Sequence, residues 1–150
     1  MLGKLARWLR LLGYDAAYLR DTDDLEVVRQ ARTQGRLVLT RDTGLAARRA
    51  VRALLIDSQS LDEQLEQVAQ AVGLPAEDTP PRCPACNVPL EHLAYEVAQN
   101  RVPPYVWRTH RTFTICPQCG RTYWEGSHWR AIRQRLRAAG VVESPSHRVE

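Results

Sequence analysis

Hydrophobic positions in the first half of the chain switch between a helical and a strand-like pattern. Apolar residues recur every three to four positions in four segments, which predicts helices, and they run together in three short segments, which predicts strands. The predicted helices span Met1–Gly13, Asp24–Thr33, Thr43–Val51 and Ser60–Val72. The predicted strands span Tyr14–Leu19, Arg36–Thr40 and Ala53–Ile56. Strands that alternate with helices pair in parallel through right-handed crossovers, so we expect an α/β sandwich.

The first predicted helix has two distinct faces. At 100° per residue its apolar side chains share one arc of about 120°, and a separate arc of similar width is basic. The apolar arc consists of Leu2, Leu5, Trp8, Leu9 and Leu12, and the basic arc of Lys4, Arg7 and Arg10. The apolar arc predicts packing against the rest of the fold. The basic arc is either a solvated face or a contact surface for phosphates.

The second half has a different organisation, which begins after a linker with two prolines and two acids at Ala76–Pro81. Two short strands are predicted over Arg111–Cys116 and Arg121–Trp124, as a hairpin, and a basic helix over His128–Ala139. Val141–Glu150 is expected to be a frayed tail. We therefore divide the chain into an α/β domain at 1–78, a zinc-binding module with the basic helix at 79–140, and a tail at 141–150.

Four cysteines, Cys83, Cys86, Cys116 and Cys119, form the strongest motif of the sequence. They are the only cysteines of the chain and follow the pattern C-x2-C-x29-C-x2-C. Two such pairs supply four thiolates at the corners of a tetrahedron, which predicts a structural zinc ribbon with no open position for catalysis. Two disulfides are the alternative. Because Lys4, Arg7 and Arg10 interrupt any apolar core of a signal peptide, we expect a cytoplasmic protein with reduced thiols.

Charge is distributed unevenly over a net value of +4. Residues 1–78 hold 11 basic and 12 acidic side chains, whereas residues 79–150 hold 10 basic and 5 acidic ones. No apolar run approaches the roughly 18 residues of a membrane span. The second half thus favours a polyanion such as RNA, and the first half carries the acids. Ordinary solvated charge is the alternative.

Aromatic residues of the second half fit either a core or an RNA surface. Tyr105, Trp107, Phe113, Tyr123, Trp124 and Trp129 are interleaved with Arg101, Arg108, Arg111 and Arg121. Aromatic rings stack on bases and arginines hold phosphates, which would suit RNA. A small zinc module also needs a core, and we assign Phe113 and Trp124 to it.

Acidic residues follow two of the predicted strands. Asp42 comes directly after Arg36–Thr40, and Asp23 and Asp24 open the second helix. Carboxylates that converge at the carboxyl ends of parallel strands can hold Mg²⁺ or Mn²⁺, which activates water against a phosphodiester. Helix capping is the competing interpretation, since aspartate accepts hydrogen bonds from the first amides of a helix.

Several segments have a combined resemblance to a known family, namely Met1–Asp15, Leu39–Asp42, Arg101–Pro104, the two Cys-Pro-x-Cys knuckles and Tyr123–Trp129. In this order, over roughly residues 1–135, they resemble the Mut-seven C-terminal RNase domain family, a PIN-like group. The resemblance implies a PIN-like three-layer parallel sheet followed by a small zinc ribbon with four cysteine ligands, and metal-dependent RNA cleavage. It matches Asp42 to the Thr-x-Asp acid of the family and Asp24, with Asp23 in reserve, to the helix-opening acid.

The sequence departs from the family at its start. PIN-like domains begin with a strand that ends in a first metal-binding aspartate, just before the segment that matches Met1–Asp15. Neither feature is present before Met1. This leaves two expectations open: translation begins upstream, or the chain has lost nuclease activity.

The resulting hypothesis is an Mg²⁺- or Mn²⁺-dependent ribonuclease with a structural zinc ribbon that aids RNA binding. Asp42 and Asp24 would hold the catalytic metal, and Arg41 with the Lys4, Arg7 and Arg10 face would contact the RNA backbone. The alternatives are an inactive RNA-binding protein and a zinc ribbon that docks a protein partner.

Overall fold

The computed structural model describes residues 2–18, 24–46, 52–76, 78–138 and 148–149. Its first helix, α1, spans Gly3–Leu11 and buries Leu5 and Leu9 on its apolar face. The helix stops because Gly13 takes a φ of +104°, a value that suits glycine. The Gly13 amide then donates to the Arg10 carbonyl. The predicted amphipathic helix with a glycine stop is confirmed.

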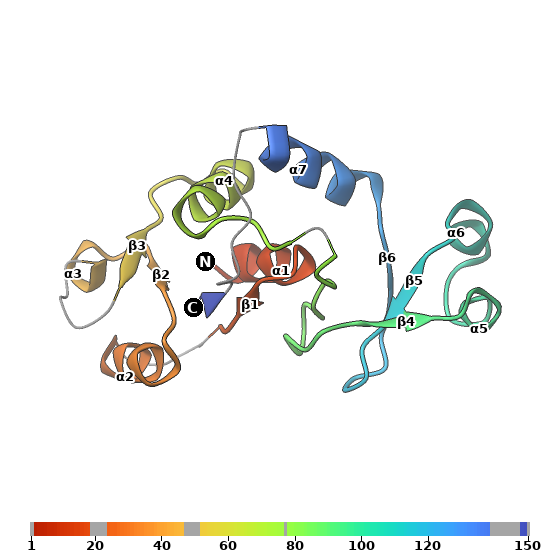
Figure 1. Cartoon of the computed structure of the whole chain (residues 1–150), viewed down its shortest axis with the longest axis horizontal. Coiled ribbons are helices and arrows are strands. Elements are labelled where there is room, and N and C mark those ends of the chain that lie inside the picture. Colours follow the sequence, from red (N-terminus) through yellow and green to blue (C-terminus); the bar gives the residue numbers. More distant parts are fainter. Residues whose placement is uncertain (1, 19–23, 47–51, 77, 139–147, 150) are drawn as a thin grey trace.

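The first half contains the predicted alternation of helices and strands. Its elements after α1 are β1 (Asp15–Ala16), α2 (Asp24–Gln34), β2 (Val38–Thr40), α3 (Thr43–Ala46), β3 (Ala53–Leu55) and α4 (Leu61–Val72). β2 and β3 pair in parallel, with Val38 opposite Ala53 and Thr40 opposite Leu55. The α/β class and this parallel pair are confirmed. The described residues form two-stranded parallel sheets (Figure 1), so the larger three-layer sheet stays a prediction.

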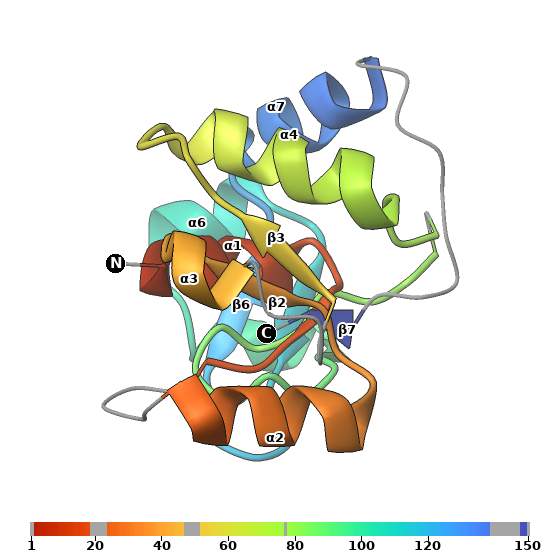
Figure 2. The same ribbon diagram turned by 90° about the vertical axis from the view of Figure 1, so that its left-hand side faces the viewer.

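The end of the chain contributes a strand that the sequence does not predict. β7 (Arg148–Val149) lies parallel to β1, with Arg148 opposite Asp15 and Val149 opposite Ala16. The rest of the expected tail, 141–147 and 150, lies outside the described residues. Residues 148–149 therefore lie against the first half of the chain (Figure 2).

The second half is built on a three-stranded antiparallel sheet. β4 (Glu91–Leu93) pairs with β5 (Phe113–Ile115), which pairs with β6 (Thr122–Trp124), so the predicted hairpin of the last two strands is confirmed. The long insert between the knuckles also contains two short helices, α5 (Tyr95–Ala98) and α6 (Pro104–Thr109). Phe113 is fully buried, as expected. Trp124 is 38% exposed, so its assignment to the core is wrong.

Tyr95 of α5 and Trp107 of α6 join the two short helices of the insert through a reciprocal contact. The rings of Tyr95 and Trp107 stack with centroids 4.5 Å apart. The Trp107 indole donates to the Tyr95 carbonyl at 2.9 Å, and the Tyr95 hydroxyl donates to the Trp107 carbonyl at 3.2 Å. Stacking and hydrogen bonds together hold α5 against α6 and leave these two aromatic residues in a structural role.

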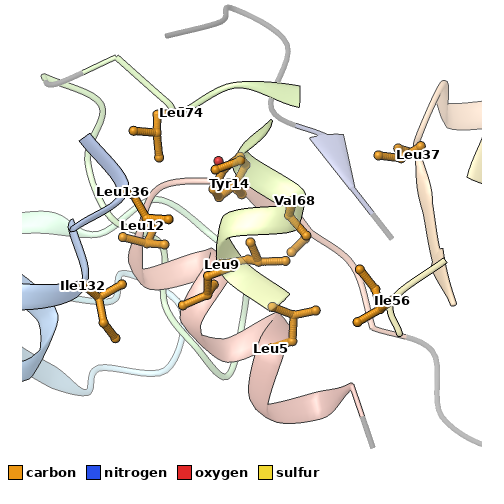
Figure 3. Close-up of a cluster of buried hydrophobic side chains, with 13 residues drawn as sticks. Leu5, Leu9, Leu12, Tyr14, Leu37, Ile56, Val68, Leu74, Ile132 and Leu136 are labelled. Atoms are coloured by element: carbon orange, nitrogen blue, oxygen red, sulfur yellow. The ribbon is translucent and has the colours of Figure 1, made fainter. Parts of the chain in front are cut away.

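The last helix, α7 (Ser127–Ala138), packs on the first half of the chain. Ile132 and Leu136 belong to the same buried cluster as residues from α1 and α4 (Figure 3). The Trp129 indole donates to the Leu11 carbonyl at 3.1 Å. Arg135 forms ion pairs with Asp62 and Glu66 of α4. The basic helix that the sequence groups with the zinc module therefore completes the core of the α/β half.

Truncation of Leu136 tests this packing. Leu136→Ala is expected to lower the free energy of unfolding by about 2–5 kcal/mol, because it leaves a cavity between α7 and the core. Leu25→Ala is the matched control, since Leu25 is 70% exposed on α2 and its loss costs at most about 0.5 kcal/mol. Urea unfolding followed by tryptophan fluorescence measures both. Equal effects of the two variants would contradict the packing of α7 on α1 and α4.

Candidate functional site

The four cysteines converge on a single point. The Sγ atoms of Cys83, Cys86, Cys116 and Cys119 all lie within 4.8 Å of one another, and those of Cys83 and Cys119 are 3.8 Å apart. A zinc–sulfur bond of about 2.3 Å in a tetrahedron requires sulfurs about 3.8 Å apart. All four thiols are free. This arrangement favours metal binding over the disulfide alternative, and the residues fit a structural zinc ion with four sulfur ligands.

The backbone of each knuckle turns at a residue with a positive φ. Asn87 and Gly120, which follow the second cysteine of each pair, have φ values of +60° and +77°. The Asn87 amide donates to the Cys83 carbonyl, and the Gly120 amide donates to the Cys116 carbonyl. In the second knuckle, the amides of Gln118 and Cys119 lie 3.4 Å from the Cys116 sulfur. Such N–H···S contacts stabilise a thiolate, so the turns are shaped for a metal.

The two thiols of the first knuckle have opposite pKa shifts. Burial alone would raise the pKa of Cys83, but hydrogen bonds with the Tyr123 hydroxyl, at 3.2 Å, and with backbone amides lower the pKa to about 7. Burial and the adjacent thiols raise the pKa of Cys86 to about 12. Metal binding at neutral pH would therefore release a proton from Cys86.

Arg10 connects α1 to the first knuckle. Its Nε donates to the Ala16 carbonyl at 2.7 Å, and its Nη1 donates to the Pro84 carbonyl at 2.6 Å. The Arg82 amide in turn donates to the Arg10 carbonyl. Arg10 thus occupies the interface between the two halves, and two of its donor nitrogens are used there and not for a ligand.

A second connection joins β1 to the same knuckle. The Asn87 side chain donates to the Asp15 carboxylate at 2.7 Å, and its oxygen accepts the Ala16 amide at 3.1 Å. Arg36 also donates to the Asp15 carboxylate, at 3.1 Å. Burial alone would raise the pKa of Asp15, but the Asn87 hydrogen bond and the Arg36 charge outweigh it and lower the pKa below its ordinary value. Asp15 is therefore a structural anion at the junction.

The depressed pKa gives this junction a defined pH dependence. A carboxyl whose folded pKa is lowered stabilises the fold above its unfolded pKa, about 3.9, and loses that contribution as the pH falls through the folded value. Asp15→Asn is therefore expected to lower the free energy of unfolding by about 1–3 kcal/mol at neutral pH. The difference from the wild type should be constant from pH 7 to about pH 5 and narrow only below about pH 4.

Urea unfolding at several pH values measures this difference. Asp57→Asn serves as the control, because Asp57 is exposed. A deficit that vanishes already above about pH 5 would contradict the assignment of Asp15 as the ionised partner.

Asp42 lies at the carboxyl end of β2, where the sequence places it. Its Oδ1 accepts the Gly44 amide at 2.8 Å, and its own amide donates to the Thr40 hydroxyl at 3.0 Å. It therefore caps α3, and its Oδ2 has no hydrogen bond to a described residue. Asp24 is the first residue of α2, its side chain is not among those described, and Asp23 lies outside the described residues. Among the described residues, the cysteines form the only cluster of three or more potential metal ligands.

Basic side chains line a small cavity near this strand end. Lys4 and Arg41 share a cavity of about 370 Å³ with Gln59, Leu61 and Gln64 at the start of α4. Arg41 also lies 3.4 Å from the Ser58 carbonyl. Figure 2 shows α3 and the N-terminal ends of α1 and α2 on the same side of the molecule. The structure thus brings together Lys4 and Arg41, two of the four predicted RNA contacts.

One comparison with known proteins identifies the family. A family model for the Mut7-C RNAse domain matches residues 1–136. The chain belongs to the Mut7-C RNase domain family. The match confirms the resemblance drawn from the sequence motifs, and a Mut7-C domain indicates a nuclease. No curated protein and no solved structure matches the chain.

The match shows that the Mut7-C domain includes both halves of this chain. Residues 1–136 run from α1 through the zinc-binding cysteines and into α7, which packs back on α1. The contacts of Arg10 and Asn87 between the halves are therefore contacts within one family domain. Among the residues that the structure describes, no helix has the length and apolarity to cross a membrane.

Sequence reasoning missed the side chains that join the two halves. The sequence pattern places Arg10 on a basic face and assigns no side-chain role to Asn87, because Pro84 and Ala16, their partners across the junction, lie more than 70 positions away. The one available signal in the Mut7-C sequence is Asn87 itself. Glycine would adopt the positive φ of this position at least as easily, so an asparagine here indicates a use for its side-chain amide.

Proposed function

We propose that this chain is a ribonuclease that hydrolyses RNA phosphodiester bonds with Mg²⁺ or Mn²⁺, in which the zinc ribbon is structural and aids RNA binding. The match to the Mut7-C RNase domain over residues 1–136 carries the proposal, because it spans the α/β half and the ribbon together. The parallel β2–β3 pair, with α3 between its two strands, supports the PIN-like three-layer sheet as its scaffold, and the parallel β1–β7 pair is compatible with it. A cytoplasmic location is part of the proposal, because a zinc site of four thiolates suits a reducing compartment.

Asp42 and Asp24 are the proposed ligands of the catalytic metal, with Asp23 in reserve. Asp42 stands between β2 and α3, and Asp24 is the first residue of α2. In Figure 2, α3 and the N-terminal end of α2 lie on the same side of the molecule. The described residues supply one carboxylate of this set, so a complete site depends on the side chains of Asp24 and Asp23. When bound, the metal would supply a hydroxide and neutralise charge on the phosphodiester.

Lys4 and Arg41 are proposed to position the RNA backbone beside Asp42. Both line the same cavity at the carboxyl end of β2, and both carry donors without acceptor capacity. Cations at this point would orient a phosphate next to the carboxylate and reduce repulsion between the two anions. Arg7 is proposed to contact RNA farther along α1. For Arg10 we retain only a secondary contact, because Ala16 and Pro84 use its nitrogens.

A second candidate function is RNA binding without cleavage. It is favoured by the hydrogen bond from the Gly44 amide to Asp42, which gives this acid a complete structural role as the cap of α3. In that case the basic surface binds RNA and the acids only begin helices. A zinc ribbon that docks a protein is a third interpretation.

The products of the reaction separate these functions. Zinc-loaded protein is incubated with end-labelled single-stranded RNA and Mn²⁺, and the product ends are analysed. Attack by a metal-activated water is expected to leave linear phosphate ends, whereas attack by the ribose 2′-hydroxyl would leave 2′,3′-cyclic phosphate. Cyclic ends would contradict the metal-hydroxide proposal, and RNA that is bound but intact would favour the second candidate.

A further inference from the structure

A large groove separates the exposed face of α1 from the zinc ribbon. It has a volume of about 1070 Å³ and is bounded by α1, by the Pro84–Ala85 turn of the first knuckle and by the β6 side of the ribbon. Pockets for small ligands are usually about 300–1,000 Å³. The groove lies at the upper end of this range, so it has room for a short segment of a polymer as well as for a small molecule.

The basic residues of the groove come from both halves of the chain. Lys4, Arg7 and Arg10 line it from α1, Arg121 lines it from the ribbon, and no lining residue is acidic. Arg10 already donates hydrogen bonds to two backbone carbonyls and lies beside the cysteine thiols. Lys4 and Arg7 are exposed and form no ion pair with a described residue. A groove whose charged lining residues are all cations raises the local concentration of anions and favours a polyanion.

The groove is continuous with the strand-end site through one residue. Lys4 lines the groove and also the smaller cavity that contains Arg41. Arg7 lies one helical turn farther along α1, in the direction of the ribbon. A strand whose phosphate is held by Lys4 and Arg41 beside Asp42 would therefore pass along α1 into the groove.

The aromatic walls of the groove favour a single strand over a duplex. Trp8, Tyr18 and Tyr123 line it, and each ring is fixed by a neighbour. Trp8 meets His128 edge to face, with centroids 5.0 Å apart, and the Tyr123 hydroxyl lies beside Cys83. The Tyr18 ring lies over Gly3, where a Cβ would be 3.4 Å from it. Fixed rings offer stacking surfaces of about 1–3 kcal/mol per base, which only unpaired bases can use.

We propose that the groove between α1 and the zinc ribbon binds single-stranded RNA on one side of the cleavage site, with Arg7 and Arg121 as its phosphate contacts. This inference rests on the proposed RNA substrate and adds to it the binding site, the strandedness of the substrate and a role for the ribbon. It places Arg121, which comes late in the sequence, in the same site as the first helix.

Binding without cleavage tests the groove independently of catalysis. Zinc-loaded protein is titrated into a labelled oligouridine of about 12 nucleotides, within the usual range of single-strand sites, in buffer without Mg²⁺ or Mn²⁺. Fluorescence anisotropy gives the dissociation constant. Arg7→Ala and Arg121→Ala are each expected to weaken binding about 3- to 10-fold and to lower the slope of log K against log salt by about one. Arg32→Ala is the matched control, because Arg32 is also an exposed arginine of a helix, α2, but lies outside the groove. Zinc analysis of Arg121→Ala confirms that the ribbon is intact.

The outcomes separate the groove from the ribonuclease proposal. Binding of both groove variants within twofold of the wild type, an equal loss in Arg32→Ala, or equal affinity for an RNA duplex of the same length would overturn the groove. Loss of binding in the groove variants without any cleavage by the wild type would support the groove and refute the ribonuclease. If the wild type cleaves RNA and the groove variants bind RNA normally, the ribonuclease is supported and the groove is refuted.

Discussion

Cys116→Ser is expected to abolish zinc binding and to unfold the β4–β6 sheet. Cys116 is buried, its sulfur is one of the four ligand positions, and two backbone amides point at it. Structural zinc contributes an apparent binding free energy of about 10–16 kcal/mol in small zinc modules. This is as large as the whole stability of a typical domain, about 5–15 kcal/mol. The core around Phe113 and Val106 is small and has no comparable substitute.

Metal analysis and hydrogen exchange measure the two parts of this prediction. The wild type should contain one zinc per chain, and the variant should contain almost none. Amides of β5 and β6 should lose protection in the variant, whereas those of β2 and β3 keep most of theirs. Ala85→Ser is the control, since Ala85 is an exposed knuckle residue whose replacement removes no thiol. A wild type purified without chelator that contains no zinc would contradict the ribbon.

Asp42→Asn is expected to lower the rate of RNA cleavage by about 10²- to 10³-fold, because it weakens binding of the metal that would stabilise the developing charge, and losing one such stabilising contact usually has this cost. The substitution is chosen because asparagine caps a helix nearly as well as aspartate. It can still accept the Gly44 amide, so α3 and the thermal midpoint should be preserved. The change therefore removes the charge of Asp42 and leaves its structural role.

Single-turnover cleavage with Mn²⁺ measures the effect. Asp78→Asn is the matched control, because Asp78 is an exposed acid of the linker, and its rate should stay within twofold of the wild type. Cleavage by Asp42→Asn at the wild-type rate would remove Asp42 from the mechanism and leave it as a cap only.

The helices and strands with clear periodicity could be predicted from the sequence, whereas β4, α5 and α6 could not. α1 and α4 each bury a regular apolar stripe, and the β5–β6 hairpin flanks a cysteine pair. β4 has only one buried residue, Leu93, so its pattern carries no alternation. α6 has six residues, which is too short for a helical period, and its order comes from the contact between Trp107 and Tyr95.

The candidate site was predictable in part for the same reason. The spacing of the cysteines determines their chemistry locally, so the four ligands could be assigned before any fold was known. The use of Arg10 and Asp15 at the junction depends on Pro84 and Asn87, which reach them only through tertiary packing. The groove likewise combines Arg7 with Arg121, and no periodicity connects two such distant positions.

Hydrolysis of RNA with a divalent metal is the central activity proposed for this chain. The dependence of the cleavage rate on Mn²⁺ concentration, measured with the zinc-loaded chain and a labelled single-stranded RNA, tests it most directly. We predict no cleavage without Mn²⁺ and a rate that rises with Mn²⁺ to a plateau. RNA that is bound with measurable affinity but stays intact at every Mn²⁺ concentration would contradict the account.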